Sequence, residues 1–148
     1  MEGSHPKDVF PRLQYLEFRL CTQLTSISWV VNLPCIRELS LDCCSSVKQL
    51  IQIDELKSSG VEVSQYSFPS LKIIWLRTME LERISDPIIS FPALEFLNVI
   101  GSILKELPFK YSNLPRKLKW IQGDEEWWNN IEMEDADKSS LQPFFKKR

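Results

Sequence analysis

Apolar residues recur along the chain in one frame that fits four separate segments. In each segment apolar side chains fill the first, fourth and sixth positions, the ninth is Cys, Met or Ser, and another apolar residue follows near the eleventh. The segments begin at Leu13, Ile36, Leu71 and Leu94, each just after an aromatic residue or Leu followed by Pro, and a degenerate fifth begins at Leu118. Alternating character at the start of a segment indicates a strand with one buried face. The frame predicts parallel strands centred on Leu16, Leu39, Ile74, Leu97 and Trp120.

This frame is the leucine-rich-repeat pattern, which has a period of roughly 20–29 residues. The four first positions lie 23, 35 and 23 residues apart, so the second unit is longer than the others. We expect its extra residues, about 51–67, to form a loop on the side away from the sheet, because they include Lys57-Ser58-Ser59-Gly60. A helix from Ser46 to Leu56 is an alternative for part of this stretch. The predicted fold class is α/β: a curved leucine-rich-repeat solenoid with a parallel sheet on its concave side, irregular short repeats and a C-terminal cap.

The chain divides into three predicted parts. Residues 1–8 are polar and are expected to be a disordered start, and residues 9–123 hold four clear repeats and one degenerate repeat. Residues 124–148 are expected to be a capping tail, in which a short helix lays Trp127, Trp128 and Ile131 on the last repeat. A repeat array needs an atypical first unit to cover its open end, and none precedes Leu13 here. The blunt start therefore suggests a fragment of a longer protein.

The ninth positions hold Cys21, Cys44, Met79 and Ser102. An Asn there would satisfy backbone groups of the turn that follows the strand; we expect cysteine to do so weakly, serine moderately and methionine not at all. The chain lacks a Cys-x-x-Cys pair, so the four cysteines are expected to be reduced structural thiols rather than disulfides or zinc ligands.

Composition excludes several classes of function. A net charge of −2 over 148 residues predicts no bulk attraction to nucleic acid or anionic lipid. No apolar run approaches the ~18–20 residues of a membrane span, and the start lacks a signal peptide, so a cytoplasmic location is expected. His5, the single histidine, lies in the polar start, which leaves no base for a Ser-His or Cys-His pair. We expect no enzyme, no bound metal and, for the acidic run from Asp124 to Asp137, only a solvated face.

Residues between the buried positions form three rows across the predicted sheet. Natural solvent-facing rows are mostly polar, so Ile73, Trp75, Phe96 and Trp120 at the C-terminal half form an apolar patch of the kind that marks a contact. The contact could be with an outside protein, with another domain of the same parent chain or with the chain's own tail. The predicted protein-binding residues are Tyr15, Arg19, Glu38, Asp42, Ile73, Trp75, Arg77, Phe96 and Trp120.

One family shares several of these features together. The features are the Phe-Pro-x-Leu starts, the ninth-position Cys, the enlarged unit before Phe68, and the ending Ile121-Gln122-Gly123-Asp124-Glu125-Glu126-Trp127-Trp128 with Leu141-Gln142-Pro143-Phe144-Phe145. With them the chain resembles the C-terminal region of a plant disease-resistance protein, the coiled-coil type of nucleotide-binding leucine-rich-repeat immune receptor. The likeness covers about residues 9–148. It implies a non-catalytic module for recognition and autoinhibition in plant defense. Implied partners are proteins: a pathogen effector, a host guardee, or the nucleotide-binding region of the same receptor.

The family's nucleotide site does not carry over. The four glycines, Gly3, Gly60, Gly101 and Gly123, form no Gly-x-x-x-x-Gly-Lys loop, so no ATP, ADP or other cofactor is expected. Two other functions remain open: the substrate-recognition repeats of a ubiquitin-ligase adaptor, and a secreted inhibitor of a microbial enzyme. The adaptor would need an upstream F-box segment, and the inhibitor a signal peptide and Asn-x-Ser/Thr sites; neither set of features occurs here.

Overall fold

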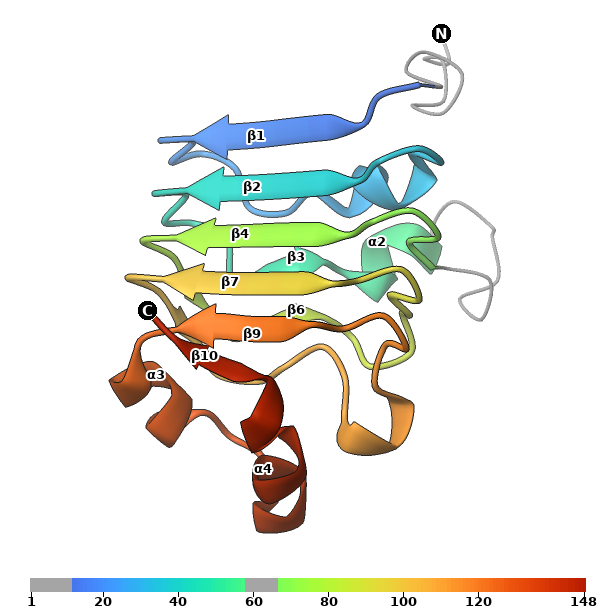
Figure 1. Ribbon diagram of the computed structural model, residues 1–148. Helices are drawn as coiled ribbons and strands as arrows, with labels where there is room; N and C mark the ends of the chain where they lie inside the picture. The colour runs from blue at the N-terminus through green and yellow to red at the C-terminus, as the bar shows by residue number, and fades with distance from the viewer. Residues whose placement is uncertain (1–11, 58–66) are drawn as a thin grey trace, which may run out of the picture.

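A parallel β-sheet forms the centre of the molecule. The structure, a computed structural model, describes residues 12–57 and 67–148. In these ranges six strands lie in the order β1-β2-β4-β7-β9-β10, and every neighbouring pair is parallel (Figure 1). The strands are β1 (Tyr15–Arg19), β2 (Glu38–Asp42), β4 (Ile73–Arg77), β7 (Phe96–Ile100), β9 (Trp120–Gly123) and β10 (Phe145–Lys147).

The register of the first five strands follows the apolar frame. Leu16, Leu39, Ile74, Leu97 and Ile121 lie side by side across the sheet. This confirms the predicted parallel strands, although β9 aligns Ile121 rather than Trp120 with the centres of the others. Parallel pairing without slippage gives the same frame position the same inward direction in every strand; it is buried in β2, β4, β7 and β9 and half-buried in the edge strand β1.

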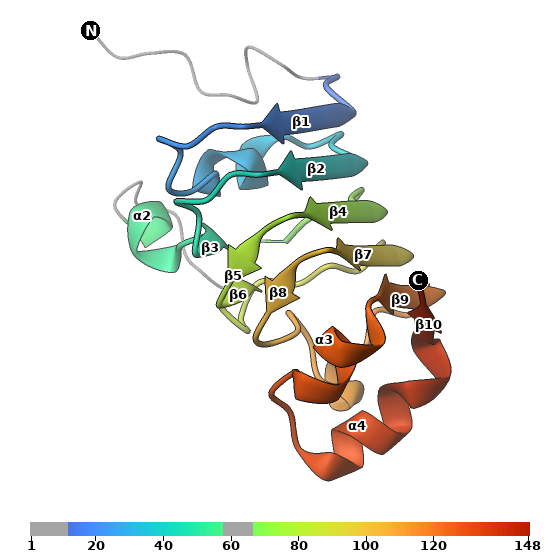
Figure 2. The same ribbon diagram turned by 90° about the vertical axis from the view of Figure 1, so that its left-hand side faces the viewer.

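A second layer covers one face of this sheet (Figure 2). It contains two short parallel pairs and several short helices. The strands are β3 (Gln49–Ile51) with β6 (Arg83–Ser85), and β5 (Glu80–Leu81) with β8 (Ile103–Leu104). Among the described residues, the helices outside the tail are η1 (Ser28–Asn32), α2 (Ile53–Lys57) and η3 (Tyr111–Asn113). The hydrophobic core lies between the layers, where Leu41, Ile74, Leu76, Leu97 and Val99 are fully buried.

The long unit differs from its prediction where it is described. Residues 51–57, expected to be loop, form the end of β3 and the helix α2, and the alternative helix from Ser46 to Leu56 is replaced by a strand followed by a shorter helix. Pairing of Gln49 with Arg83 fixes the strand, and Leu50 and Ile51 are both buried. The Asp86 carboxylate accepts a hydrogen bond from the Ile53 N–H at 3.3 Å, which satisfies one backbone donor at the start of α2. Residues 58–66 and the predicted disordered start, 1–8, lie outside the described residues.

The turn after each of four strands contains one residue in the left-handed region. These residues are Leu20, Cys43, Thr78 and Gly101, with φ of 55°, 57°, 53° and 57°. The N–H groups of the first three each donate to a carbonyl at the end of the next strand. After β7 the next strand ends earlier, and the Gly101 N–H donates instead to the Asp124 carboxylate at 3.1 Å.

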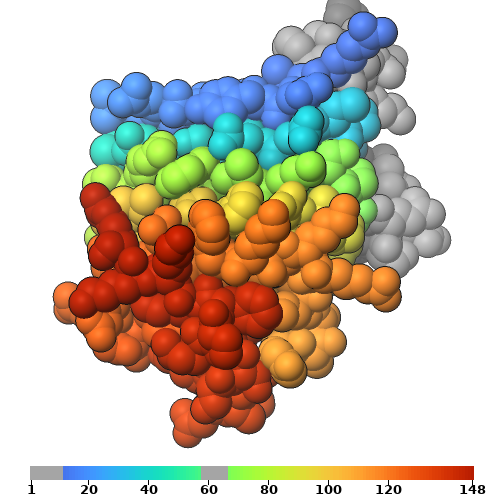
Figure 3. All heavy atoms as spheres, in the orientation of Figure 1, coloured from blue at the N-terminus to red at the C-terminus, as the bar shows by residue number. Residues whose placement is uncertain are grey.

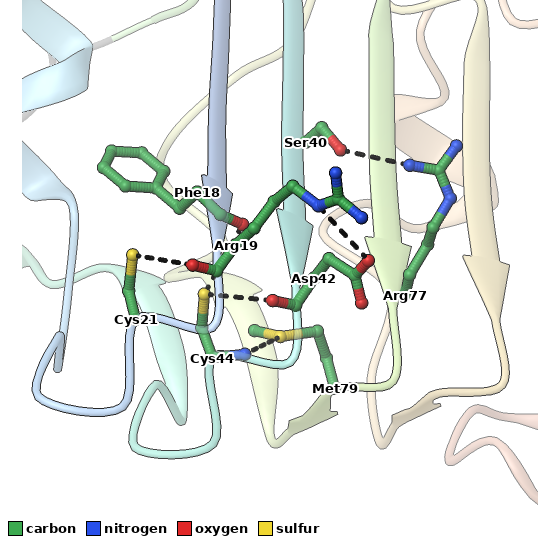
Figure 4. Close-up of polar contacts among 8 residues, drawn as sticks. All are labelled: Phe18, Arg19, Cys21, Ser40, Asp42, Cys44, Arg77 and Met79. Carbon is green, nitrogen blue, oxygen red and sulfur yellow. Dashed lines mark hydrogen bonds and ion pairs between the residues drawn. The ribbon is translucent and has the colours of Figure 1, made fainter.

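The ninth-position side chains bond to these turns, and Figure 4 shows Cys21, Cys44 and Met79. Ser102 Oγ donates to a strand carbonyl, that of Leu76 or Ile100, and accepts the Met79 N–H at 2.9 Å. The Cys44 thiol lies 3.6 Å from the Phe18 and Asp42 carbonyls. The expectation that Met79 contributes nothing is wrong, because its thioether sulfur lies 3.3 Å from the Cys44 N–H and accepts it. A thioether is a weak acceptor, but this one is buried beside its donor.

The tail adds helices and an unpredicted strand. It contains α3 (Glu125–Asn130), α4 (Asp135–Leu141), η4 (Gln142–Phe144) and β10, which pairs with β9. Trp127 and Trp128 are buried, and Trp128 stacks on Phe145 with ring centroids 4.7 Å apart. The short helix with buried aromatic residues matches the sequence prediction. No helix in the two described ranges is long and apolar enough to cross a membrane.

Candidate protein-contact surface

The sheet face opposite the second layer, here called the open face, carries all nine predicted site residues. Neighbouring strands align them in three rows. The first row is Tyr15, Glu38, Ile73, Phe96 and Trp120; the second is Glu17, Ser40, Trp75, Asn98 and Gln122; the third is Arg19, Asp42, Arg77 and Ile100. The structure therefore brings the residues together as the frame predicted, because alternation along each strand sends them to one face.

The aromatic patch, defined as Ile73, Trp75, Phe96 and Trp120, is half-buried. Phe96 and Trp120 are neighbours in the first row, with ring centroids 4.3 Å apart and ring planes tilted by 44°. This separation lies within the favourable range for aromatic pairs. The patch is therefore continuous across β4, β7 and β9.

Asn98 holds the indole of Trp120 in position. The Trp120 Nε1–H donates to Asn98 Oδ1 at 3.4 Å, and the Asn98 amide donates to the Ile74 carbonyl at 3.4 Å. Asn98 is only 2% exposed, and both of these bonds end within the sheet. A buried amide between two partners restricts the rotamer of Trp120. Asn98 is not among the predicted protein-binding residues, although the register places it in the second row.

Trp75 is held from two sides. Its Nε1–H donates to the Glu38 carboxylate at 3.1 Å, and the Arg77 guanidinium carbon lies 4.5 Å from the ring centroid. Arg77 Nη1 also donates to Ser40 Oγ at 3.4 Å (Figure 4). These contacts come from β2 and β4, so the polar and cationic partners of Trp75 belong to the sheet itself.

Arg19, Asp42 and Arg77 alternate in charge along the third row, but only Arg19 and Asp42 form an ion pair. Asp42 lies 3.9 Å from Arg19, whose side chain is 67% exposed (Figure 4), and an exposed pair of this kind contributes little stability. Arg77 turns toward Ser40 and Trp75 rather than toward Asp42. At the far end of the first row, desolvation and then the Glu17 carboxylate raise the pKa of Tyr15.

Two lysines beside the patch were missed by sequence reasoning. Lys119 Nζ lies 3.0 Å from the Glu95 carboxylate and 5.5 Å from the Phe96 ring centroid. The hydrogen bond from Lys119 holds the pKa of Glu95 below its usual range. Lys119 directly precedes β9, so its place beside the first row could have been found from the frame. Lys146 Nζ, 4.3 Å from the Trp120 ring centroid, could not, because it lies on the unpredicted β10.

The tail accounts for only part of the patch. Figure 3 shows the C-terminal segment lying against one end of the open face. Lys146 brings the tail to Trp120, which is at that end. The contact of Lys146 therefore does not account for the exposure of Ile73 and Trp75, which lie on β4 at the other side of the patch.

Comparisons with known proteins give one consistent group. Two probable disease resistance proteins of Arabidopsis thaliana are each 28% identical to the chain, over 140 residues (93% of it) and 102 residues (68% of it). These alignments cover 15% and 11% of the relatives' own lengths, so the chain spans a small part of each. No family model matches the sequence, and no solved structure matches it. Over most of its length the chain is thus similar to plant disease resistance proteins.

Proposed function

We propose that the chain is the C-terminal leucine-rich-repeat region of a plant disease resistance protein of the coiled-coil, nucleotide-binding type. In this proposal residues 9–123 are repeats of a curved solenoid with the open face on its concave side, and residues 124–148 are the C-terminal cap. Three observations support it: the in-register parallel strands, the left-handed residue at the same point of four turns, and the similarity to the two Arabidopsis proteins.

The open face then serves as a non-catalytic protein-contact surface in plant defense. The observation that carries this is the aromatic patch, four half-exposed apolar side chains on a sheet face. Aromatic residues and arginine are enriched at the centres of protein interfaces, and covering exposed apolar surface with a partner lowers the free energy. Trp75 between Glu38 and Arg77 is already oriented, so less side-chain entropy is lost when a partner covers it.

The proposed partner is a pathogen protein, a host protein, or the nucleotide-binding region of the same receptor. The first two correspond to recognition and the third to autoinhibition. All three place the chain in the cytoplasm.

A photo-cross-linking amino acid introduced at position 73 in plant cells tests this function. Ile73 lies in the aromatic patch, and Ile103, which is 56% exposed on β8 of the second layer, is the matched control position. We expect a cross-linked protein from position 73 and not from position 103. Peptides identified from the product will distinguish another protein from the parent's nucleotide-binding region.

Two tryptophan variants extend the test to energetics. Trp75→Ala should weaken noncovalent binding of the partner by about 2 kcal/mol or more, the usual loss for an aromatic interface anchor, and so lower the cross-linking yield from position 73. Trp29→Ala is the control, since Trp29 is 37% exposed on η1 in the second layer. Equal yields from positions 73 and 103, or cross-links only to this chain's own tail, would show that the patch is structural.

A further inference from the structure

Four cations lie beside the aromatic patch, whereas Arg19 lies on β1 at the other end of the open face. Lys72 directly precedes β4, Arg77 ends it, Lys119 precedes β9, and Lys146 lies on β10. Glu95 binds Lys72 at 3.9 Å and Lys119 at 3.0 Å, so those two lysines share one carboxylate. Within the described part of the chain, neither Arg77 nor Lys146 has a carboxylate within 4 Å. Two cations at the edges of the patch are therefore available to an anion.

Both available cations are held over aromatic rings. The Arg77 guanidinium lies 4.5 Å from the Trp75 ring centroid and Lys146 Nζ lies 4.3 Å from that of Trp120. A ring attracts a cation through its electrons but does not neutralise its charge. The rings therefore fix where the two charges stand and leave each free to accept a carboxylate.

The backbone spacing of Arg77 and Lys146 can be estimated from the sheet. Lys146 aligns with Gln122 and hence with Trp75, three strand steps away, and Arg77 is two residues further along β4. Strands are spaced about 4.8 Å apart and rise about 3.3 Å per residue, so the backbone positions are roughly 16 Å apart. An extended peptide covers that distance in about five residues. Phe96 on β7 and Trp120 on β9 lie between β4 and β10 in strand order, in the first row, which borders the second row on the side away from Arg77.

We propose that the partner presents an extended acidic segment to the open face, with two carboxylates about five residues apart and apolar side chains between them. One carboxylate binds Arg77, the other binds Lys146, and side chains between them reach sideways to Trp120, whose ring lies beside Lys146, and to Phe96 next to it. This inference rests on the proposed protein-contact function and adds the chemistry of the partner.

A nucleic acid strand fits the face less well. Its charges are continuous, whereas the face toward β1 presents Glu17, Glu38 and Asp42, which would repel phosphates. Two separated carboxylates match the two separated cations, and only the one at Arg77 comes near an acid, Asp42, its neighbour on β2. The partner is accordingly a protein segment.

A synthetic peptide assay tests the inference independently of any natural partner. The probe is a short labelled peptide with Glu at two positions five residues apart and Leu and Phe between them, and its reference has Gln at both positions. Fluorescence anisotropy at low ionic strength should show several-fold tighter binding of the Glu peptide. The difference should shrink as salt rises, because exposed charges are screened.

Neighbouring lysines of β10 provide a matched pair of variants. Lys146→Gln and Arg77→Gln should each weaken binding of the Glu peptide about two- to fivefold, the range for exposed ion pairs. Lys147→Gln removes the same charge from the adjacent residue, which binds Glu125 at 3.0 Å, and should leave binding unchanged. The Gln peptide should be insensitive to all three variants.

Several results would overturn the inference. These are equal binding of the Glu and Gln peptides, no binding of either, an equal effect of Lys146→Gln and Lys147→Gln, or tighter binding of a single-stranded oligonucleotide than of the Glu peptide. Each of these leaves the cross-linking result from position 73 intact, so an error in the partner's chemistry is distinguishable from an error in the proposed function.

Discussion

Gly123 is the position where one added methyl group should do the most damage. A Cβ atom there would lie 2.5 and 2.7 Å from two ring carbons of Trp127 and 2.8 Å from the Val99 carbonyl oxygen. All three distances are below those that Cβ atoms adopt. Trp127 is 6% exposed and its Nε1–H donates to the Leu104 carbonyl at 2.9 Å, whereas the Val99 carbonyl belongs to the backbone of β7. Neither neighbour can move away cheaply, so Gly123→Ala should cost about 1–3 kcal/mol of unfolding free energy, the usual cost of overpacking.

Urea unfolding followed by tryptophan fluorescence measures this cost. Gly101→Ala is the matched control, because nothing lies within 4 Å of its added Cβ and only its φ of 57° opposes the substitution. That variant should lose about 1 kcal/mol from backbone strain alone. Trp127→Leu, which removes the ring, should relieve much of the Gly123→Ala cost and none of the Gly101→Ala cost. An unchanged urea midpoint for Gly123→Ala, or a cost that ignores Trp127→Leu, would refute the packing argument.

Three further predictions concern the core, a thiol and an ion pair. Leu97→Ala should lower the unfolding free energy by about 2–5 kcal/mol because Leu97 is fully buried, whereas Ile103→Ala, at a 56% exposed side chain, should change it by less than about 0.5 kcal/mol in a urea melt. Burial raises the pKa of the Cys44 thiol, so maleimide should label Cys44 more slowly than the half-exposed Cys43 until urea is added; equal native rates, read by mass spectrometry, would contradict this. The pKa of Glu95 is lower in the folded state than its unfolded-state value of about 4.3, so the ionised carboxylate stabilises the fold above that pH. This stability is lost as pH falls through the folded-state pKa. In urea melts, Glu95→Gln should therefore flatten the decline in unfolding free energy between about pH 5 and 3.

The sequence predicted the sheet and the rows of the open face for one physical reason. Each strand pairs in register with the next, so the same frame position points inward in every unit and is buried between neighbouring units, as Leu39, Ile74 and Leu97 are. Once the frame is aligned, alternation places Trp75 and Phe96 on the opposite face without further information. What these side chains contact is a separate question. The pairing of Trp75 with Glu38 depends on rotamers that no periodic pattern encodes.

The turns and the tail could not be predicted in the same way. Thr78 adopts a φ of 53° that sequence reasoning reserves for glycine, because the hydrogen bond of its N–H to the Ile100 carbonyl and the packing of the turn outweigh the strain. Strand β10 has three residues and lacks the apolar frame. Its position depends on tertiary contacts of the tail, including the stacking of Phe145 on Trp128. A local hydrophobic pattern cannot predict a strand whose position depends on packing against Trp128, which lies elsewhere in the sequence.

The tail therefore connects the stability of the last strand with the chemistry of the open face. Gly123 lies in β9, its lack of a side chain lets Trp127 pack closely, and the same tail returns as β10 beside β9. Lys146 reaches Trp120 only because β10 pairs in that register, with Lys146 opposite Gln122. A change that displaces Trp127 should for that reason also move Lys146 away from the aromatic patch. Sequence features at the end of the chain that look purely structural thus help to set the charge of the contact surface.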